Sequence, residues 1–457
     1  MTDAFSVAEE HIRNLKPDRP FGKVVGVSGM VVTCNGLEGT AIGSRCHLER
    51  KNGDVIPAEV VGYKDDAVLV MPFAAVEGIG PGCRVYMGSD SQTIHVNNGF
   101  VGRVINALGE PIDDKGPLPL GGDERPLKTP APAPGSRKEI GGKLDVGVRA
   151  INTFLPLCRG QRMGIFSGSG VGKSTLLGMI AKYAKADINV IALTGERGRE
   201  VMEFIRTSLG EEGLARSIVV VATGDEPPLM RRQAAYTAMA VAEHFRDAGR
   251  QVLMMMDSVT RFAMAQREIG LSAGEPPTTR GYTPSVFSEL PRLLERAGTC
   301  GGEGTITGLF TVLVEGGDMD EPVADAVRGI LDGHIVMDRD LAERGHFPSI
   351  NILKSVSRAM PECNSAEETM LINKARGHYA TYDNMAELIR LGAYKKGSDP
   401  EVDNAIQYAK PLDEFLIQEP DESATMEEGF RALDDILQQG KQARNQARED
   451  KAPKDDT

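Results

Sequence analysis

The chain has 457 residues, of which 41% are hydrophobic and 26% are charged, and its formal net charge is −13 at pH 7. This length predicts about three domains, and the acidic balance argues against a general electrostatic grip on nucleic acid or on an anionic membrane. Six cysteines without C-x-x-C spacing and seven histidines without a ligand cluster favour a reducing cytoplasm and no structural zinc.

The first twenty residues predict a short amphipathic helix. Phe5, Ala8, Ile12 and Leu15 fall on one face, which ends before Pro17. The apolar face of this predicted helix is isolated from the rest of the sequence pattern, so it either packs on its own chain or docks on a partner subunit. The segment has no apolar core of signal-peptide length, and no later window offers about eighteen uninterrupted apolar residues. We therefore expect neither secretion nor membrane insertion by the chain's own means.

Short β-rich runs follow, separated by turn residues, and together they predict a small closed barrel. These runs cover residues 23–33, 56–63, 67–72 and 84–87. Residues 102–143 are then loaded with Gly and Pro, which exclude regular helix and central strand. We predict an extended connector there.

Apolar runs alternate with helical patterns through the central part of the chain, about residues 146–360. The predicted strands cover residues 163–166, 188–194, 218–222, 251–256 and 309–314. This alternation predicts a parallel sheet covered on both faces, with ligands bound at the carboxyl ends of the strands.

From Ser365 onward the pattern is helical. Ser365-x-x-Glu368 and Ser398-x-x-Glu401 predict capping-box starts, and Gly392 and Gly397 predict helix ends. A last helix has one apolar face, and beyond Gly440 the apolar-poor, mixed-charge stretch predicts disorder. The residues of that face are Phe430, Leu433 and Leu437.

A glycine-rich turn at residues 167–174, S-G-S-G-V-G-K-S, joins the first of the central strands to a helix. This order predicts a phosphate cradle, in which backbone N–H groups point inward, Lys173 reaches the β/γ-phosphates and the Ser174 hydroxyl ligates Mg²⁺. The strict pattern asks for glycine where Ser167 stands. Glycines at positions 168, 170 and 172 can still supply the unusual φ angles, so we expect nucleoside triphosphate binding.

Two further strands end in carboxylates. Asp257 closes residues 251–257, the arrangement that supports Mg²⁺ beside a phosphate turn. Glu196 follows residues 188–194 and can orient the attacking water, while Arg197 can neutralise phosphoryl charge. A helix N-terminus that carries acids to match its dipole is an equally open interpretation of this second segment. We expect the three methionines at 254–256 to fill the core.

Arg358 ends the segment S-V-S-R at 355–358, which follows an apolar run at 350–353. It is the best candidate for an arginine that reaches a neighbouring subunit's nucleotide. Because the chain has 52 lysines and arginines, most of them solvated, its position alone does not single it out.

Six segments, taken together, resemble the hexameric ATPases of type III secretion, relatives of the catalytic subunits of rotary ATP synthases. The similarity runs in order from about residue 22 to residue 437, and the flagellar branch fits best through L-G-A-Y-K-K-G-S-D-P-E-V-D at 391–403. The six segments are GSGVGKS at 168–174, GERGRE at 195–200, DSVTRF at 257–262, GEPPTTRGY at 274–282, LDGHI at 331–335 and SVSR at 355–358.

The resemblance implies an α/β fold with a RecA-like parallel-sheet nucleotide domain, an N-terminal β-barrel and a C-terminal helical domain, assembled as a homohexamer. The expected parts are a partner-binding helix at 1–20, the barrel at 21–95, a connector at 96–145, the ATPase domain at 146–360, the helical domain at 361–440 and a disordered tail at 441–457.

The resemblance also implies that ATP and Mg²⁺ are bound and assigns roles to single residues. Glu196, Lys173, Arg197 and Arg358 are then catalytic, Arg358 as the finger offered to the next subunit, and Ser174 and Asp257 hold the metal. Phe347 lies against the adenine ring, and Phe415 adds to that pocket. The remaining nucleotide contacts are Gly168, Ser169, Gly170, Val171, Gly172, Lys173, Ser174 and Thr175.

For the function, the resemblance implies ATP hydrolysis that energises export of flagellar proteins, by unfolding substrates or releasing them from chaperones. The expected partners are a stator-like regulator at the N-terminal helix, export-gate membrane proteins and chaperone-bound substrates, with no nucleic acid. The expected location is cytoplasmic, peripheral to the inner membrane. A virulence injectisome stays open as the machine served, although overall similarity favours the flagellum.

Three other functions fit less well. A rotary synthase subunit carries an acidic run in its helical domain, and residues 365–416 show none. An RNA-acting ring helicase needs basic and aromatic residues interleaved, but in the barrel region Tyr63 and Phe73 stand nearly alone and the chain has no Trp. A regulatory subunit without turnover would not need both Glu196 and Arg358 on one chain.

Overall fold

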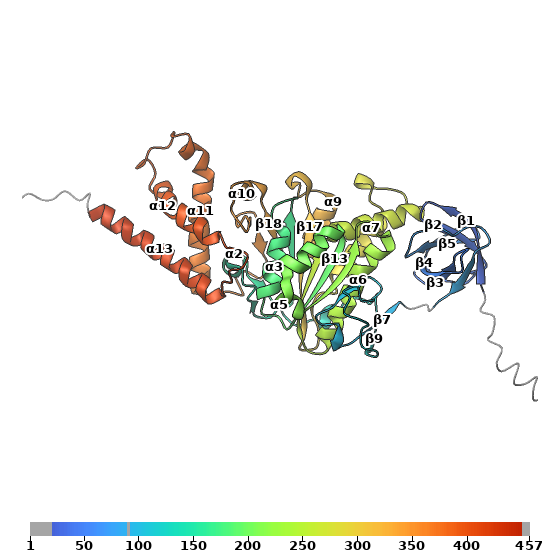
Figure 1. The fold of residues 1–457 in the computed structure, drawn as a ribbon. Helices are drawn as coiled ribbons and strands as arrows, with labels where there is room; N and C mark the ends of the chain where they lie inside the picture. The colour runs from blue at the N-terminus through green and yellow to red at the C-terminus, as the bar shows by residue number, and fades with distance from the viewer. Residues whose placement is uncertain (1–20, 89–91, 450–457) are drawn as a thin grey trace, which may run out of the picture. The chain divides into compact units, whose positions relative to one another are not determined.

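We describe the protein from a computed structural model, which covers residues 21–88 and 92–449, with side chains to residue 440 (Figure 1). The predicted partner-binding helix at 1–20 and the end of the tail lie outside the described residues. The chain divides into two compact units. The first holds the barrel with the short segments 227–229 and 268–276, and the second holds the remaining described residues.

The first unit is a closed barrel of antiparallel strands, as predicted, in the order β1-β2-β5-β4-β3-β6. The predicted run at 23–33 is a hairpin rather than one strand, because Gly29 turns the chain at φ 57°. A third strand, which the sequence did not predict, alternates buried and half-exposed residues. The strands are β1 (Phe21–Ser28), β2 (Val31–Asn35), β3 (Arg45–Glu49), β4 (Val55–Lys64), β5 (Ala67–Pro72) and β6 (Arg84–Met87).

The second unit is built on a nine-stranded sheet with the order β19-β18-β12-β17-β15-β13-β14-β8, and β16 pairs with β17 off this path. All pairings are parallel except those of β16 and β19. The strands are β8 (Val104–Asn106), β12 (Arg162–Ser167), β13 (Ile188–Glu196), β14 (Ser217–Thr223), β15 (Gln251–Asp257), β16 (Gly298–Thr299), β17 (Thr305–Leu313), β18 (Gly333–Met337) and β19 (Val356–Ser357).

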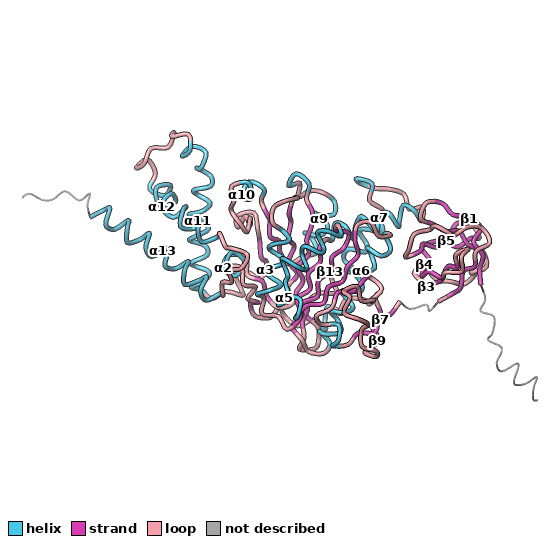
Figure 2. Tube along the Cα trace, viewed as in Figure 1, coloured by secondary structure: helices cyan, strands magenta, loops and turns pink. Residues whose placement is uncertain are grey.

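Both faces of this sheet are covered, as the alternation of strands and helices predicts. β14 and β15 have no exposed residue, and Met254, Met255 and Met256 are fully buried, which confirms them as core. The helices between the strands include α3 (Lys173–Tyr183), α6 (Pro228–Asp247), α7 (Val259–Ser272) and α9 (Pro322–Ile330), seen in cyan beside the magenta strands in Figure 2.

The Gly- and Pro-rich connector contributes one strand of the sheet, which we did not predict. β8 pairs in parallel with β14 at the edge of the sheet. The N–H of Gly102 donates to the carbonyl of Ser217, and the N–H of Val219 donates to the carbonyl of Arg103. The Asp113 carboxylate accepts hydrogen bonds from the Arg103 guanidinium at 2.7 Å and from the backbone N–H of Val104 at 3.0 Å. Three residues are too few to show a periodic pattern, so tertiary contacts define this strand.

The C-terminal helices are α11 (Ala366–Arg390), α12 (Pro400–Leu416) and α13 (Met426–Glu449). The capping box at Ser365 is confirmed. The predicted box at Ser398 is wrong, because Asp399 is the N-cap and its carboxylate accepts from the N–H groups of Glu401 and Val402. Phe430, Leu433 and Leu437 are all buried, as expected for one apolar face.

α13 continues nine residues beyond Gly440, so the prediction of disorder is wrong for residues 441–449. This stretch contains no Gly or Pro and has two each of Ala, Gln and Arg, which all favour helix. Among the residues that the structure describes, no helix combines the length and apolarity needed to cross a membrane.

Candidate active site

The glycine-rich turn lies between β12 and α3, at the carboxyl end of a central strand. Gly170 and Gly172 adopt left-handed φ angles of 76° and 86°, whereas Gly168 does not, so two of the three expected glycines supply unusual backbone geometry. α3 begins at Lys173, with Gly172 as its N-cap. Ser174 and Thr175 are exposed on its first turn. Backbone N–H groups at such a helix start are free to bind an anion.

The side chain of Phe347 lies directly over this turn. A Cβ built on Gly172 would stand 3.3 Å from the Phe347 ring, so glycine lets the ring approach the backbone closely. The hydroxyl of Ser349, two residues on, donates to the carbonyl of Val171 at 2.7 Å and fastens the two loops together. The Phe347 side chain is 42% exposed, which leaves an apolar face available beside the turn.

Three parallel strands bring Lys173, Glu196 and Asp257 to one edge of the sheet. The Lys173 ammonium forms an ion pair with Oδ1 of Asp257, at the end of β15, and lies 3.9 Å from Oε1 of Glu196, at the end of β13. From β17, between β12 and β15, the Thr311 hydroxyl donates to Oδ1 of Asp257 at 2.8 Å. The sequence-predicted lysine and both carboxylates therefore meet at a single point.

Glu196 has the electrostatic character of a general base. Burial raises its pKa above the ordinary 4.5, and the neighbouring Asp257 raises the pKa further, while Lys173 and Arg261 act in the opposite direction. Oε1 of Glu196 is buried and accepts no hydrogen bond from the described residues. A buried carboxylate oxygen that accepts no hydrogen bond, beside a phosphate turn, is suited to hold a water molecule.

Two residues of this site had no predicted role. Thr311 fixes the Asp257 carboxylate, and Arg261 packs against Gly195, where an added Cβ would come within 2.8 Å of the Arg261 side chain. The φ of Gly195 is 75°, which also favours glycine. Arg261 lies within the segment at 257–262 that carried the resemblance, so its place in that string was the available signal; Thr311 offered none.

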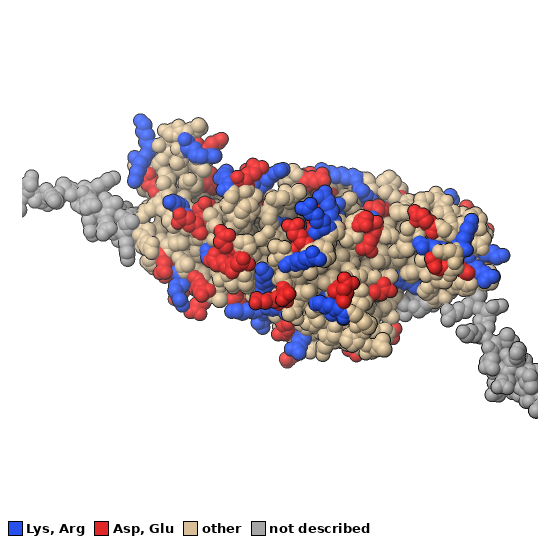
Figure 3. All heavy atoms as spheres, in the orientation of Figure 1, with Lys and Arg blue, Asp and Glu red and all other residues tan. Residues whose placement is uncertain are grey.

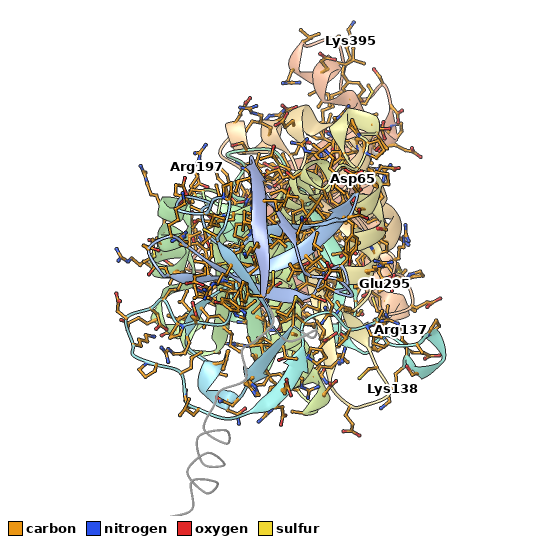
Figure 4. All side chains as sticks on the ribbon, turned by 90° about the vertical axis from the view of Figure 1, so that its right-hand side faces the viewer. Asp65, Arg137, Lys138, Arg197, Glu295 and Lys395 are labelled. Carbon is orange, nitrogen blue, oxygen red and sulfur yellow. The ribbon has the colours of Figure 1, made fainter. Side chains whose placement is uncertain are left out.

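Arg197 lies apart from these groups. Its side chain is 84% exposed and pairs with Glu200 at 3.1 Å, and Figure 4 shows it extending from the edge of the molecule. The ring of Phe415 is buried and packs edge-to-face on Phe154, with ring centroids 6.2 Å apart. Two contacts join the segments that carry Phe347 and Phe415. The N–H of Gln418 donates to the carbonyl of Phe347 at 2.9 Å, and Nδ1 of His346 lies 3.2 Å from Oδ1 of Asp413.

Arg358 lies at the opposite end of the sheet from the phosphate turn. It directly follows β19, in which Ser357 pairs with Gly333 at the start of β18, and its N–H donates to the carbonyl of Asp332. The turn follows Ser167, which pairs with Met337 at the other end of β18. Gly333 and Met337 are four residues apart on β18, so about 13 Å of strand separates the level of Arg358 from that of the phosphate turn. Arg358 therefore does not face the phosphate turn of its own chain.

Figure 3 shows Lys and Arg interspersed with Asp and Glu over the face in view. In Figure 4, Arg137 and Glu295 lie close together, and their side chains form an ion pair at 3.3 Å. Within residues 21–88 and 92–440, no group of three or more His, Cys, Asp or Glu side chains is arranged to hold a metal ion.

Comparison with known proteins agrees with this architecture. Residues 147–357 match the ATP synthase alpha/beta family, nucleotide-binding domain; residues 24–87 match the beta-barrel domain of the same family; and residues 364–435 match the T3SS EscN ATPase C-terminal domain. A flagellum-specific ATP synthase of Caulobacter vibrioides is 53% identical over 434 residues, 93% of this chain and 98% of the relative. The chain belongs to the family of flagellum-specific ATP synthases and type III secretion ATPases.

Other members of this ATPase family extend the match. A flagellum-specific ATP synthase of Bacillus subtilis is 54% identical over 90% of this chain and 94% of its own. Among solved structures, the assembled ATPase EscN of enteropathogenic E. coli superposes with a TM-score of 0.86 at 42% identity, covering 91% of this chain and all of EscN. The predicted three-part fold and the prediction of ATP hydrolysis are thus confirmed.

Proposed function

We propose that this chain is the ATPase of a flagellar type III export apparatus and works as a homohexameric ring. The observation that carries the proposal is the meeting of Lys173, Glu196 and Asp257 at the carboxyl ends of parallel strands, in a chain of this family. Hydrolysis there would supply energy for unfolding export substrates or releasing them from chaperones. Seven relatives between 43% and 54% identical are flagellum-specific, which favours the flagellum.

Within the proposed site, the backbone of residues 168–175 holds the phosphates and Lys173 binds the β/γ-phosphate oxygens. Lys173 exchanges its ion pair with Asp257 for these oxygens when ATP binds. Glu196 orients the water molecule and accepts its proton, a task that suits a carboxylate whose pKa is raised by burial. Phe347, which overlies the turn, packs on the adenine ring. Arg197 approaches the γ-phosphate only if its exposed side chain turns inward from Glu200.

The residues present fit a hydrated Mg²⁺ ion. The Ser174 hydroxyl is exposed at the start of α3, and the Asp257 carboxylate, held by Thr311 of β17, lies at the end of β15, two strands along from β12. Oxygen ligands of this kind, supplemented by water and phosphate, are those Mg²⁺ prefers. Ser174 and Asp257 would hold the ion, which would neutralise charge on the β- and γ-phosphates.

Arg358 acts in a neighbouring subunit, according to this proposal. Its place at the far end of the sheet from its own phosphate turn supports a role in a site completed across an interface. In a closed ring each chain then gives one arginine and receives one. An arginine of this type contributes a factor of about 10³ to 10⁵ to turnover.

A mixing experiment tests the shared site. Lys173→Ala and Arg358→Ala should each lose hydrolysis when assembled alone. In rings assembled from equal amounts of both variants, about a quarter of the interfaces pair an intact Lys173 with an intact Arg358, so about a quarter of wild-type turnover should return. Doubling either variant alone is the control. No recovery in rings proven to be mixed would overturn the shared site.

We also propose specific partners for this chain, in line with its family. EscN has been solved in complex with its central stalk EscO, and we extend a stalk-like partner to this chain. A stator-like regulator at residues 1–20, export-gate proteins and chaperone-bound substrates complete the set, at the cytoplasmic side of the inner membrane. Proteins that co-purify with the chain test this: flagellar chaperones and rod or hook subunits support it, whereas virulence effectors assign the chain to an injectisome.

A further inference from the structure

Two cysteines, far apart in sequence, meet beside Arg358. Cys158 is fully buried in β11 (Leu157–Cys158), and Cys363 is partly exposed in the turn before α11. Their thiols are hydrogen-bonded to each other. Both line a cavity of about 640 Å³ that Arg358 also lines. A small oxidant that enters this cavity reaches a pair of adjacent sulfur atoms.

A lysine stands next to this pair. Lys143 of β10 (Lys143–Leu144) is the cross-strand partner of Cys158, and its ammonium donates to Oδ1 of Asn364 at 3.3 Å and to Oε1 of Glu368 at 2.7 Å. Asn364 directly follows Cys363, so the cation is held on the same side of the turn. A cation beside a thiol stabilises the thiolate, which is the form that reacts with peroxide.

The pKa values of the two thiols are shifted in opposite directions. The hydrogen bond from Cys158 lowers the pKa of Cys363 to about 7, with Lys143 acting in the same direction and burial opposing it. The same hydrogen bond, together with burial, raises the pKa of Cys158. A larger fraction of Cys363 is therefore thiolate near neutral pH than of an ordinary cysteine.

The barrel provides a contrast. Cys34 and Cys46 are both fully buried, and desolvation raises the pKa of each to about 12. These thiols have neither access nor nearby cationic support strong enough to ionise them, and we expect them to stay inert. Cys34 and Cys46 also lie near each other. The Cys158–Cys363 pair therefore differs from them in the partial exposure of Cys363 and in the neighbouring Lys143, not in the closeness of the sulfur atoms.

We infer that Cys363 is a peroxide-sensing thiol and that Cys158 resolves it as a reversible disulfide. The Cys363 thiolate attacks one oxygen of hydrogen peroxide, which breaks the O–O bond, gives the sulfenic acid and releases hydroxide. The Cys158 sulfur, on losing its proton, attacks the Cys363 sulfur and expels the second hydroxide. Two thiols and one peroxide thus become one disulfide and two water molecules.

This bond would constrain the arginine. The N–H of Cys363 donates to the carbonyl of Ala359 at 3.0 Å, and the N–H of Met360 donates to the carbonyl of Ser357 at 3.2 Å, so Arg358 lies in one folded turn with Cys363. A disulfide ties that turn covalently to β11. This consequence rests on the proposed function of Arg358. We expect oxidation to lower turnover more than about tenfold, within the factor such an arginine supplies.

The test uses the full-length wild-type chain in its reduced form, treated with a small excess of hydrogen peroxide. Free thiols are then alkylated, and the digest is analysed by mass spectrometry. The expected product is a linked Cys158–Cys363 peptide that forms before Cys300 is oxidised and disappears with dithiothreitol. Cys158→Ser should instead accumulate a dimedone adduct on Cys363, and Cys300→Ser is the matched control, which should form the linked peptide as wild type does.

The chemical result is independent of ATP, so it separates this inference from the proposed function. Absence of the linked peptide in wild type, or oxidation of Cys363 no faster than Cys300, overturns the thiol assignment. If the disulfide forms and turnover stays unchanged, the constraint on Arg358 is wrong, whether or not the mixing experiment succeeds. Loss of turnover that dithiothreitol restores in wild type, and that is absent in Cys158→Ser, supports both parts.

Discussion

Nζ of Lys173 lies 3.9 Å from Oε1 of Glu196, although the two residues come from strand ends separated in the sheet by β17 and β15. A phosphate-binding cation and the proposed water-activating carboxylate thus share one small volume. Their roles should nevertheless separate under mutation, since Lys173 acts on the bound nucleotide and Glu196 acts on the attacking water.

Glu196→Gln should keep ATP binding and lose hydrolysis. The amide is close in shape to the carboxylate but cannot accept the proton, so turnover should fall by about 10² to 10⁴. Titration with a fluorescent ATP analogue and a phosphate-release assay measure the two properties. Lys173→Ala is the comparison and should weaken binding itself. Equal loss of binding in both variants would contradict the assigned roles.

The acid side of the pH–rate profile should report Glu196. The base works when deprotonated, and burial raises its pKa above the ordinary 4.5. Activity should therefore be present above the raised pKa and be lost as the pH falls through it, at a higher pH than for an exposed glutamate. Stopped assays of kcat at a series of acidic pH values will show this fall in activity, the acid limb of the profile. The residual rate of Glu196→Gln should lack it; an identical limb in that variant assigns it to another group.

The N-terminal caps of α11 and α12 provide a stability test with a built-in control. Ser365→Ala removes the confirmed capping box and should cost about 1 kcal/mol, as should Asp399→Ala at the second helix. Ser398→Ala should cost little, because Asp399 holds the cap. Thermal melting followed by circular dichroism compares the three. If Ser398→Ala destabilised as much as Asp399→Ala, the observed cap would be wrong.

A buried ion pair in the nucleotide domain should matter most when only one partner is removed. Arg296 is 1% exposed, and its guanidinium donates to both carboxylate oxygens of Glu243, at 2.9 and 2.6 Å, and to the carbonyl of Leu127 at 2.6 Å. Arg296→Met leaves the Glu243 carboxylate buried without its counter-ion, and about 3 to 5 kcal/mol should be lost.

The double variant Glu243→Gln with Arg296→Met removes both charges and should melt at a higher temperature than Arg296→Met alone. The reason is that the desolvation cost of an unpaired carboxylate disappears with the carboxylate. Differential scanning fluorimetry of the purified chains gives the comparison. A double variant that melts lower than the single one would show that the pair's own attraction dominates.

The sequence predicted those parts of the fold that local patterns encode. The central strands contain long apolar runs, and the phosphate turn has its own motif, so their place and type were clear. The hairpin at 23–33 was missed because Gly29 is its main turn signal within a continuous β-rich run. Asp399 was overlooked as a cap because Ser398 formed a familiar pattern with Glu401.

For the site, the motif predicted Lys173 and the strand ends predicted Glu196 and Asp257. Sequence alone could not give the order β12-β17-β15-β13, on which the contact of Thr311 with Asp257 depends. Nor could it give the antiparallel direction of β19, which turns Arg358 away from its own turn. Both facts depend on the pairing of strands that are distant in the sequence, and local hydrophobic periodicity carries no information about such pairing.

The three residues of β8 decide where this chain can be cut. They cover the outer backbone groups of β14, which would otherwise be free to recruit a strand from another molecule. A fragment that starts at Thr93 keeps this cover, whereas one that starts after Asn106 discards it and invites association by strand addition. A fragment designed to contain the nucleotide domain alone must therefore retain residues 104–106, although their sequence resembles that of a linker.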